Sequence, residues 1–222
     1  DPDMDIDEAL ARRDFTINAM AWDPDTLELR DPFNGRADLA AHVLRHASDR
    51  FTEDPLRVLR GMQLAARFEL TVAPETVALC RTLSQESQPS ERLWEEWKKL
   101  LLQGRKPSLG LQFLRHSGWL RFYPELAALE GCPQDPIWHP EGDVWIHTLH
   151  CLDWFAAERT GDEPDDLAVG LGVLCHDFGK PATTKEEYGC VSARGHESEG
   201  TGPTERFLER LTNQHGLIEE VI

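Results

Sequence analysis

The chain has 222 residues, with 23 basic and 40 acidic side chains, a net charge of −17 and an apolar fraction of 40%. This composition is typical of a soluble globular protein, and the length allows one large domain or two to three small ones. The longest apolar stretch, residues 167–175, is far shorter than the roughly 18 to 20 residues that a membrane-spanning helix needs. Five cysteines, never in a C-x-x-C pair, indicate neither a disulfide framework nor a zinc knuckle and favour a cytoplasmic location.

The negative charge is concentrated in the second half of the chain. Residues 1–110 hold 15 basic and 20 acidic side chains, whereas residues 111–222 hold 8 and 20. A protein that grips nucleic-acid phosphates without sequence preference usually presents a strongly basic face. The composition therefore argues mildly against nucleic-acid binding, and any contact with RNA has to rest on local basic sites.

The first 47 residues are predicted to mix helix and strand. Apolar spacing predicts a helix over residues 7–22, a turn at residues 23–25 ends it, and residues 27–29 alternate as a short strand. Alternate positions at the start of the chain carry aspartates, namely Asp1, Asp3, Asp5 and Asp7. They lack the glycine and glutamate positions of a calcium loop. We therefore interpret these aspartates as a solvent-exposed acidic segment ahead of the first predicted helix.

Residues 48–130 are predicted to be helical. One helix opens near Glu53 and runs to about Phe68, with Asp54 as its N-cap and Pro55 in its first turn. In the simplest interpretation, Arg57 forms a surface ion pair there that is worth under about 1 kcal/mol.

Asp54 and Arg57 could also read a nucleobase. Residues three apart on a helix share a face, so a carboxylate acceptor and a guanidinium donor stand side by side. Cytosine and adenine present an exocyclic amine beside an unprotonated ring nitrogen, and uracil and guanine reverse that order. A fixed pair would accept C and A and reject U and G, because the wrong bases would leave buried polar groups unpaired. Spacing alone favours the simple ion pair, since such pairs are common on helices.

Four strings, in order, resemble motifs of the class II tRNA nucleotidyltransferases, the bacterial CCA-adding enzymes and their poly(A) polymerase relatives. Residues 12–19 (RRDFTINA) are similar to RRDxTxNA, residues 31–39 (DPFNGRADL) to the DPxxGxxDL hinge, residues 53–57 (EDPLR) to the nucleotide-reading EDxxR, and Glu91-Arg92 to the last motif of the neck. The resemblance implies that CTP, ATP and tRNA are partners and that Asp54 and Arg57 are the template for C and A. It also implies that Arg13, Asp14 and Asn18 contact the triphosphate and ribose of the incoming nucleotide. The implied nucleotide site consists of Arg13, Asp14, Asn18, Asp54, Arg57 and Arg60.

The catalytic carboxylates of that family are expected outside this chain. Nucleotidyl transfer uses two Mg²⁺ ions held by carboxylates, which in the family come from a GGxxRD loop and a DxD strand ahead of RRDxTxNA. Asp5 and Asp7 have D-x-D spacing but lead directly into the predicted helix, without that loop or a sheet. We therefore expect no catalytic residue for nucleotidyl transfer here, a chain truncated at its N-terminus, and no nucleotide addition by it alone.

Histidines in the last third resemble the metal site of HD-domain phosphohydrolases. Residues 144–152 have helical spacing and carry His147, and the apolar residues 167–175 predict a buried helix that ends in His176-Asp177. Burying such groups is costly unless they are paired or metal-bound. The resemblance implies a divalent metal of unknown identity, able to polarise a phosphate and generate hydroxide. The implied ligands are His147, His176 and Asp177, with His196 as a further ligand or a phosphate contact.

Together these patterns predict a mainly α fold: a remnant of an α+β nucleotidyltransferase head at 1–47, an all-α neck at 48–130 that binds nucleotide and tRNA, and an incomplete all-α HD domain at 131–222. This order most resembles the multifunctional bacterial CCA-adding enzymes, which couple CCA addition to 2′,3′-cyclic phosphodiesterase and phosphatase activity. Two alternatives stay open. One is a poly(A) polymerase or A-adding relative, although the HD signature argues against the poly(A) polymerase. The other is a chain that only binds tRNA or nucleotide. The sequence gives no indication of oligomeric state.

Overall fold

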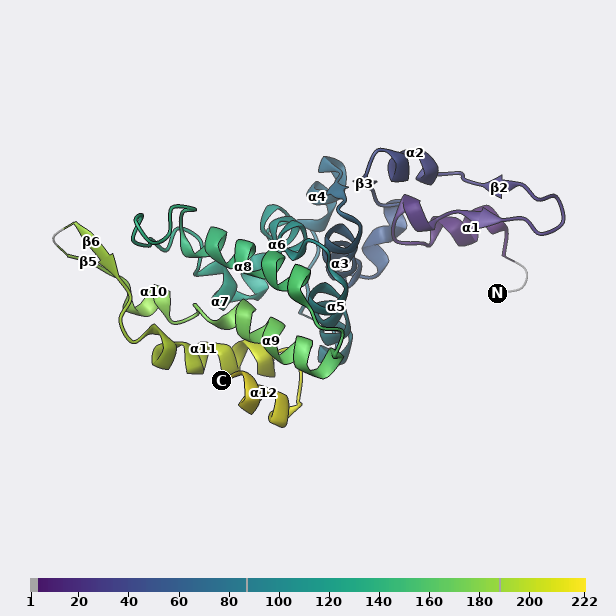
Figure 1. The fold of residues 1–222 in the computed structure, drawn as a ribbon. Helices are drawn as coiled ribbons and strands as arrows, with labels where there is room; N and C mark the ends of the chain where they lie inside the picture. The colour runs from purple at the N-terminus through teal and green to yellow at the C-terminus, as the bar shows by residue number, and fades with distance from the viewer. Residues whose placement is uncertain (1–3, 87, 188) are drawn as a thin grey trace.

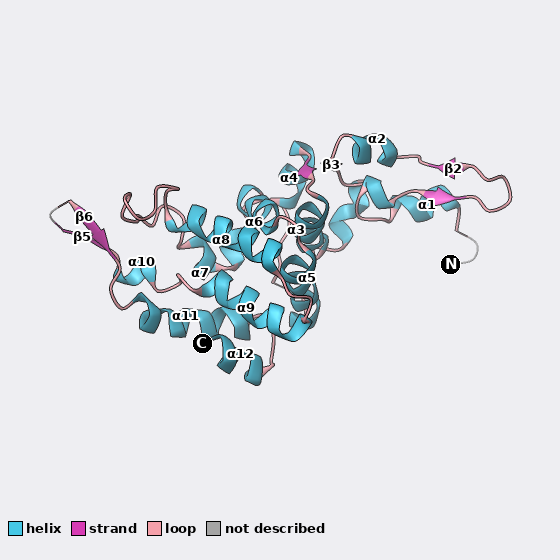
Figure 2. Cartoon of the chain, in the orientation of Figure 1, coloured by secondary structure: helices cyan, strands magenta, loops and turns pink. Residues whose placement is uncertain are grey.

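The computed structural model describes residues 4–86, 88–187 and 189–222, and helices dominate these ranges (Figures 1 and 2). The molecule is elongated, with the N-terminal segment at one end and a small hairpin of the C-terminal third at the other (Figure 1). Asp1 and Asp3 of the acidic start lie outside the described residues. Within these ranges, every helix is too short or too polar to cross a membrane.

The N-terminal segment mixes short helices and strands, as predicted, but their positions differ. It comprises α1 (Ile6–Ala11), the 3-10 turn η1 (Thr16–Asn18), β1 (Ala21–Trp22), β2 (Leu29–Arg30), α2 (Gly35–Ala40) and β3 (Val43–Leu44). β1 and β2 pair antiparallel. The predicted strand at residues 27–29 is shifted because Leu27 adopts a positive φ of 58° and belongs to the turn.

The single helix predicted over residues 7–22 is wrong. After α1, the backbone becomes extended, and Phe15 forms an antiparallel bridge with His46. Thr16 N donates to Arg45 O at 2.9 Å, and Ala47 N donates to Asp14 O at 3.1 Å. These non-local hydrogen bonds bury Phe15 completely, so tertiary pairing overrides the helical spacing of the apolar residues.

The middle of the chain is a helical bundle, as predicted, but the prediction that it is all α is wrong at one short strand, β4 (Thr71–Val72). It comprises η2 (Asp49–Glu53), α3 (Arg57–Phe68), β4 (Thr71–Val72), α4 (Pro74–Cys80), α5 (Ser90–Gln103), α6 (Pro107–His116), η3 (Trp119–Phe122) and α7 (Pro124–Ala127). α3 packs against α5 and α6, and β4 pairs parallel with β3 of the N-terminal segment. The end of α3 at Phe68 agrees with the prediction. Its start lies a turn later than predicted, because Asp54 accepts from Leu56 N at 3.1 Å in a turn before the helix.

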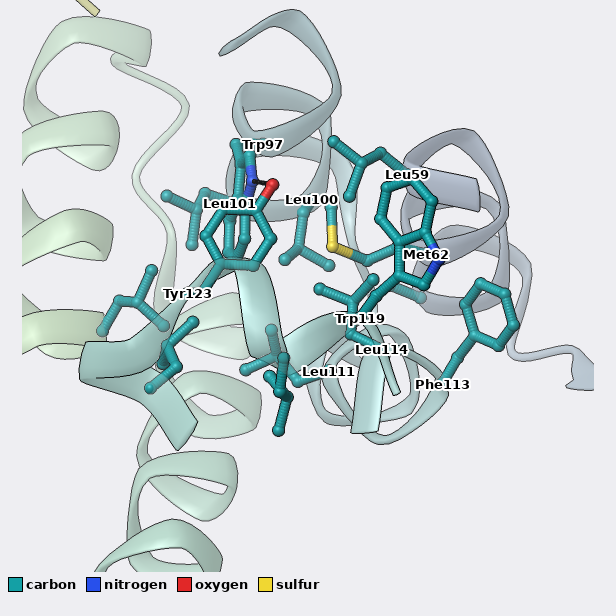
Figure 3. Close-up of a cluster of buried hydrophobic side chains, with 14 of the residues drawn as sticks. Leu59, Met62, Trp97, Leu100, Leu101, Leu111, Phe113, Leu114, Trp119 and Tyr123 are labelled. Carbon is teal, nitrogen blue, oxygen red and sulfur yellow. Dashed lines mark hydrogen bonds between the residues drawn. The ribbon is translucent and has the colours of Figure 1, made fainter. Parts of the chain in front are cut away.

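Aliphatic and aromatic side chains together fill the core of this bundle (Figure 3). Trp97 and Tyr123 are completely buried, with ring centroids 4.9 Å apart in an edge-to-face arrangement. Trp97 Nε1 donates to the Tyr123 hydroxyl at 3.0 Å, and that hydroxyl donates to Gln85 Oε1 at 2.6 Å. The polar atoms of both rings are therefore satisfied, which removes the cost of burying them.

The C-terminal third continues the same hydrophobic core. It comprises α8 (Val144–Glu158), α9 (Glu163–Cys175), α10 (Lys180–Thr183), β5 (Lys185–Glu187), β6 (Cys190–Ser192), α11 (His196–Glu209) and α12 (His215–Val221). α8 and α9 confirm the helices predicted at residues 144–152 and 167–175. The prediction that this third is all α is wrong, because β5 and β6 pair antiparallel. α9 is less buried than predicted, because Val169 on its outer face is 50% exposed.

Candidate functional site

A row of alternating positive and negative side chains joins the turn after α1 to the helical bundle. Asp14 is 5% exposed, and its Oδ1 accepts from Phe15 N at 3.0 Å while its Oδ2 accepts from Arg60 Nη1 at 2.8 Å. Arg60 Nε lies 3.8 Å from Oε1 of the buried Glu96, and Lys99 Nζ lies 3.1 Å from the same oxygen. Burial acts to lower the pKa of Arg60, but the hydrogen bond and charge of Asp14 outweigh it and raise that pKa. Arg60 therefore remains a fixed cation between two carboxylates.

The other predicted triphosphate contacts lie in the same turn. Arg13 is exposed, and its Nε donates to Asn18 O at 3.2 Å. The Asn18 side chain accepts from Phe15 N at 3.2 Å through its Oδ1. The structure thus brings Arg13, Asp14 and Asn18 together, each with a defined role in the shape of the turn.

Arg57 donates hydrogen bonds to the backbone of this turn and of η2. Its Nη2 donates to Arg12 O at 2.6 Å, and its Nη1 donates to Arg50 O at 2.6 Å. A guanidinium carries five N–H donors, so these two bonds leave three for another acceptor. Arg57 and Arg60, one turn apart at the start of α3, both reach the RRD turn.

The predicted ion pair between Asp54 and Arg57 is wrong. Asp54 Oδ2 accepts from Arg92 Nη2 at 2.7 Å, in an ion pair with the first turn of α5. Because Asp54 precedes α3, the rule that residues three apart share a helix face does not apply to it. Its partner is instead the arginine of the Glu91-Arg92 motif.

The hinge motif also contacts the RRDxTxNA segment. Asp31 caps α2 by accepting from Gly35 N at 2.6 Å and from Arg36 N at 3.0 Å. Asp38 Oδ2 accepts from Thr16 Oγ1 at 2.7 Å. A Cβ atom on Gly35 would overlap the carbonyl oxygen of Thr16, so this close approach requires glycine. The segments that carry the RRDxTxNA and DPxxGxxDL motifs therefore pack directly against each other.

A second cluster forms around Asp177, at the end of α9. The Asp177 side chain is 1% exposed and faces three histidine nitrogens. His176 Nε2 lies 3.2 Å from Oδ2, His196 Nε2 lies 3.5 Å from Oδ1, and His147 Nε2 lies 4.0 Å from Oδ2. Residues from α8, the end of α9 and the start of α11 thus converge. His176 itself is one-third exposed, contrary to the burial predicted for it.

The three imidazoles are oriented in the same way. Each has an oxygen acceptor at Nδ1, so Nδ1 carries a ring proton and Nε2 is the atom that faces Asp177. The acceptors are Glu141 Oε1 at 2.7 Å for His147, Val173 O at 2.8 Å for His176 and Ala193 O at 2.8 Å for His196.

The Asp177 carboxylate is charged and poorly satisfied. Burial acts to raise the pKa of Asp177, but His176 and then Lys180 outweigh it and lower that pKa to about 2. Lys180 Nζ lies 2.8 Å from Oδ2, yet neither carboxylate oxygen receives an aligned hydrogen bond. A buried charge with unsatisfied lone pairs is costly unless a cation binds it. The donor set of imidazole nitrogen and carboxylate oxygen suits a first-row divalent ion.

Sequence reasoning missed four members of this cluster. Glu141 accepts from both His139 Nδ1, at 3.0 Å, and His147, and its pKa is lowered to about 2 by a backbone hydrogen bond and then by these imidazoles. Lys180 follows Asp177 by three residues, and Cys151 follows His147 by four. Helical spacing from the predicted ligands could have identified the last two.

Two family models match the chain. One, described as the poly(A) polymerase head domain, matches residues 3–45, and the other, described as a probable RNA and SrmB-binding site of polymerase A, matches residues 69–129. The multifunctional CCA protein of Laribacter hongkongensis is 43% identical over 215 residues, which cover 95% of this chain and 51% of that protein. The chain is a homologue of the multifunctional CCA proteins. That of Pasteurella multocida is 39% identical, over 97% of this chain and 52% of its own length.

Solved structures support the fold of this CCA-protein homologue. A tRNA-processing enzyme in an apo form superposes with a TM-score of 0.62 at 24% identity, covering 98% of this chain and 56% of its own. A CCA-adding enzyme in complex with CTP superposes with a TM-score of 0.58 at 22% identity, covering 97% and 46%. The chain spans about half the length of the multifunctional CCA proteins it matches.

Proposed function

We propose that this chain contributes nucleotide selection and tRNA contact to a CCA-adding enzyme, which joins CMP and AMP to tRNA 3′ ends from CTP and ATP. The observation that carries the proposal is the reach of Arg57 and Arg60 from α3 to the RRD turn, at 2.6 and 2.8 Å. Arg57, one of the two residues implied for the base, thus lies next to the turn of Arg13 and Asp14, and this proximity supports the proposal. We divide the chain into a head segment at 1–47, a neck at 48–130 and an HD domain at 131–222.

The proposed template is Asp54 with Arg57. Asp54 is a carboxylate acceptor already engaged by one donor, Arg92 Nη2, and Arg57 keeps three free N–H donors. A base with an amine donor beside a ring-nitrogen acceptor would find complementary groups on these two side chains, whereas uracil or guanine would leave like groups facing each other. Arg13, Asp14, Asn18 and Arg60 would hold the ribose and phosphates.

The Mg²⁺ ions of nucleotidyl transfer have no ligands assigned here. Asp7 lies in an ion pair with Arg30 at 3.6 Å, and Asp5 is exposed. An engaged and an exposed carboxylate do not form the paired oxygen set that two such ions need. We therefore do not assign these residues to that step.

We also propose that residues 131–222 form an HD-type phosphohydrolase centre acting on 2′,3′-cyclic or simple phosphoesters. Its metal ligands would be His147, His176 and Asp177, with His196 as a fourth ligand or a phosphate contact. The unsatisfied Asp177 oxygens and the three Nε2 atoms directed at them support this assignment. When bound, a divalent ion would polarise the phosphate and activate water. Lys180 would hold the carboxylate in place.

Nucleotide selection can be tested by equilibrium binding of the four nucleoside triphosphates to the chain. We expect CTP and ATP to bind more tightly than UTP and GTP, and Asp54→Asn to remove that preference. The neighbouring Glu53→Gln, which alters an exposed carboxylate, should keep it. Equal binding of all four by the parent chain would refute the template role. A preference for ATP alone would instead favour an A-adding relative.

The metal centre can be tested by elemental analysis. The purified chain should bind about one divalent ion, and Asp177→Asn should lose it. Asp165→Asn, on the exposed face of α9, is the matched control. Full metal content in Asp177→Asn would exclude the proposed ligand set.

A further inference from the structure

Cys151 lies beside the nitrogen that His147 directs at the proposed metal. Its Sγ is 3.3 Å from His147 Nε2, the atom left free by the Nδ1 contact with Glu141. The sulfur, a ring nitrogen of His147 and a ring nitrogen of His176 all lie within 4.8 Å of one another. Because Cys151 follows His147 by one turn of α8, the helix presents both side chains on the same face.

These separations match the geometry of a shared metal. Zinc binds imidazole nitrogen at about 2.0 Å and thiolate sulfur at about 2.3 Å, so two such ligands of a tetrahedral ion stand roughly 3.5 Å apart. The observed separation of 3.3 Å is close to that value. Asp177 Oδ1 is buried, receives no aligned hydrogen bond and lies away from the Lys180 ion pair at Oδ2, which provides an independent indication that a cation belongs here.

We propose that Cys151 is a thiolate ligand of the metal centre and that it makes the centre selective for borderline or soft divalent ions such as Zn²⁺ or Co²⁺. The proposal rests on the HD-type function proposed above and adds a ligand to it. Mg²⁺ prefers oxygen ligands alone, whereas thiolate with imidazole favours zinc-like ions. A coordinated thiol gives up its proton to solvent, so binding consumes no other reactant.

Cobalt provides a direct readout, because a thiolate bonded to Co²⁺ gives a charge-transfer absorption in the near ultraviolet. The chain, stripped of metal by a chelator, is titrated with Co²⁺ alone. We expect this band in the parent chain and in Cys190→Ser, whose cysteine is exposed on β6. In Cys151→Ser the band should be absent while the visible absorption of histidine-bound Co²⁺ remains.

Affinity gives a second measurement. Cys151→Ser should weaken Cd²⁺ binding at least about tenfold relative to Mn²⁺, because only the soft ion gains from sulfur. In the parent chain, bound metal should protect Cys151 from alkylation, mapped by peptide mass spectrometry, and this test requires no variant to fold.

The outcomes separate the two proposals. Stoichiometric Co²⁺ binding without the thiolate band, or an unchanged band in a folded Cys151→Ser, overturns the thiolate ligand and leaves the histidine and aspartate centre standing. Failure of the parent chain to bind Co²⁺ overturns both.

Discussion

Arg60 Nη1 lies 2.8 Å from Asp14 Oδ2, and this ion pair joins the turn after α1 to α3. The carboxylate is almost completely buried, and Glu96 places a second buried carboxylate on the other side of the guanidinium. Arg60 compensates the buried Asp14 and shares the buried Glu96 with Lys99, so its contribution to the fold is larger than that of an exposed ion pair.

We expect Arg60→Met to destabilise the chain by roughly 1 to 3 kcal/mol. Breaking a buried pair typically costs about 3 to 5 kcal/mol, and the partial exposure of Arg60 reduces that figure. Urea unfolding followed by circular dichroism measures the change. The double variant Asp14→Asn with Arg60→Met should recover part of the lost unfolding free energy, because it removes the buried carboxylate that Arg60→Met leaves unpaired. If the two single changes simply add, the pair does not couple the two segments.

Gly35→Ala should destabilise the chain by at least about 2 kcal/mol, since the added methyl group meets backbone that cannot rotate away. The matched control is Gly172→Ala in the interior of α9, where a Cβ meets no atom within 4 Å. That change should be neutral or stabilise by up to about 1 kcal/mol, because alanine favours a helix. Thermal unfolding of both variants checks the contrast. Equal melting temperatures would show that the hinge does not depend on this close approach.

The sequence predicted α3, which carries a strong amphipathic pattern, and the apolar spacing at residues 144–152 predicted the first part of α8. The resemblance to HD domains named His147, His176, Asp177 and His196, which the fold brings together. The prediction from sequence failed at residues 7–22 because the burial of Phe15 depends on a bridge to His46, thirty-one residues away, which local periodicity cannot contain. It also assigned Asp54 the wrong partner, because the choice between Arg57 and Arg92 depends on how α5 packs beside α3.

The missed members of the metal centre show a related limit. Glu141 is in a loop, so no helical period connects it with His147, and only the folded chain places the two atoms 2.7 Å apart. Motif resemblance identifies residues that share a chemistry, whereas the groups that orient them are often found only in three dimensions.

The stability of the chain should fall as the pH decreases below about 6.5, with His46 as one cause. Burial lowers the pKa of His46 in the folded chain, so the unfolded chain binds the proton more readily. His46 Nδ1 lies 2.8 Å from Thr76 Oγ1, which also accepts from His46 N and can therefore donate its hydroxyl to the neutral ring. The contribution of His46 to the free energy of unfolding is fully present above about pH 6.5, the pKa of a histidine in the unfolded chain. It is lost as the pH falls toward the lower pKa of His46 in the folded chain.

His46→Gln, which cannot titrate, should show a smaller loss of unfolding free energy between pH 7.5 and pH 5.5 than the parent chain. His42→Gln, at a nearby loop position, is the control and should behave like the parent. Identical pH profiles for the parent and His46→Gln would exclude His46 as a source of the dependence.

Glu141→Gln should weaken binding of Co²⁺ or Zn²⁺ about tenfold without removing a ligand. Partners that orient metal-bound histidines typically contribute 10- to 100-fold in affinity. Glu141 Oε1 accepts from Nδ1 of both His139 and His147, and a neutral amide would hold these rings less firmly and make them weaker donors. Competition with a metal indicator gives the affinity, and Glu158→Gln, at the exposed end of α8, is the control. At saturating metal the variant should still bind about one ion, because the ligands remain. Unchanged affinity would mean that packing alone orients His147, and a complete loss of binding would make Glu141 itself a ligand.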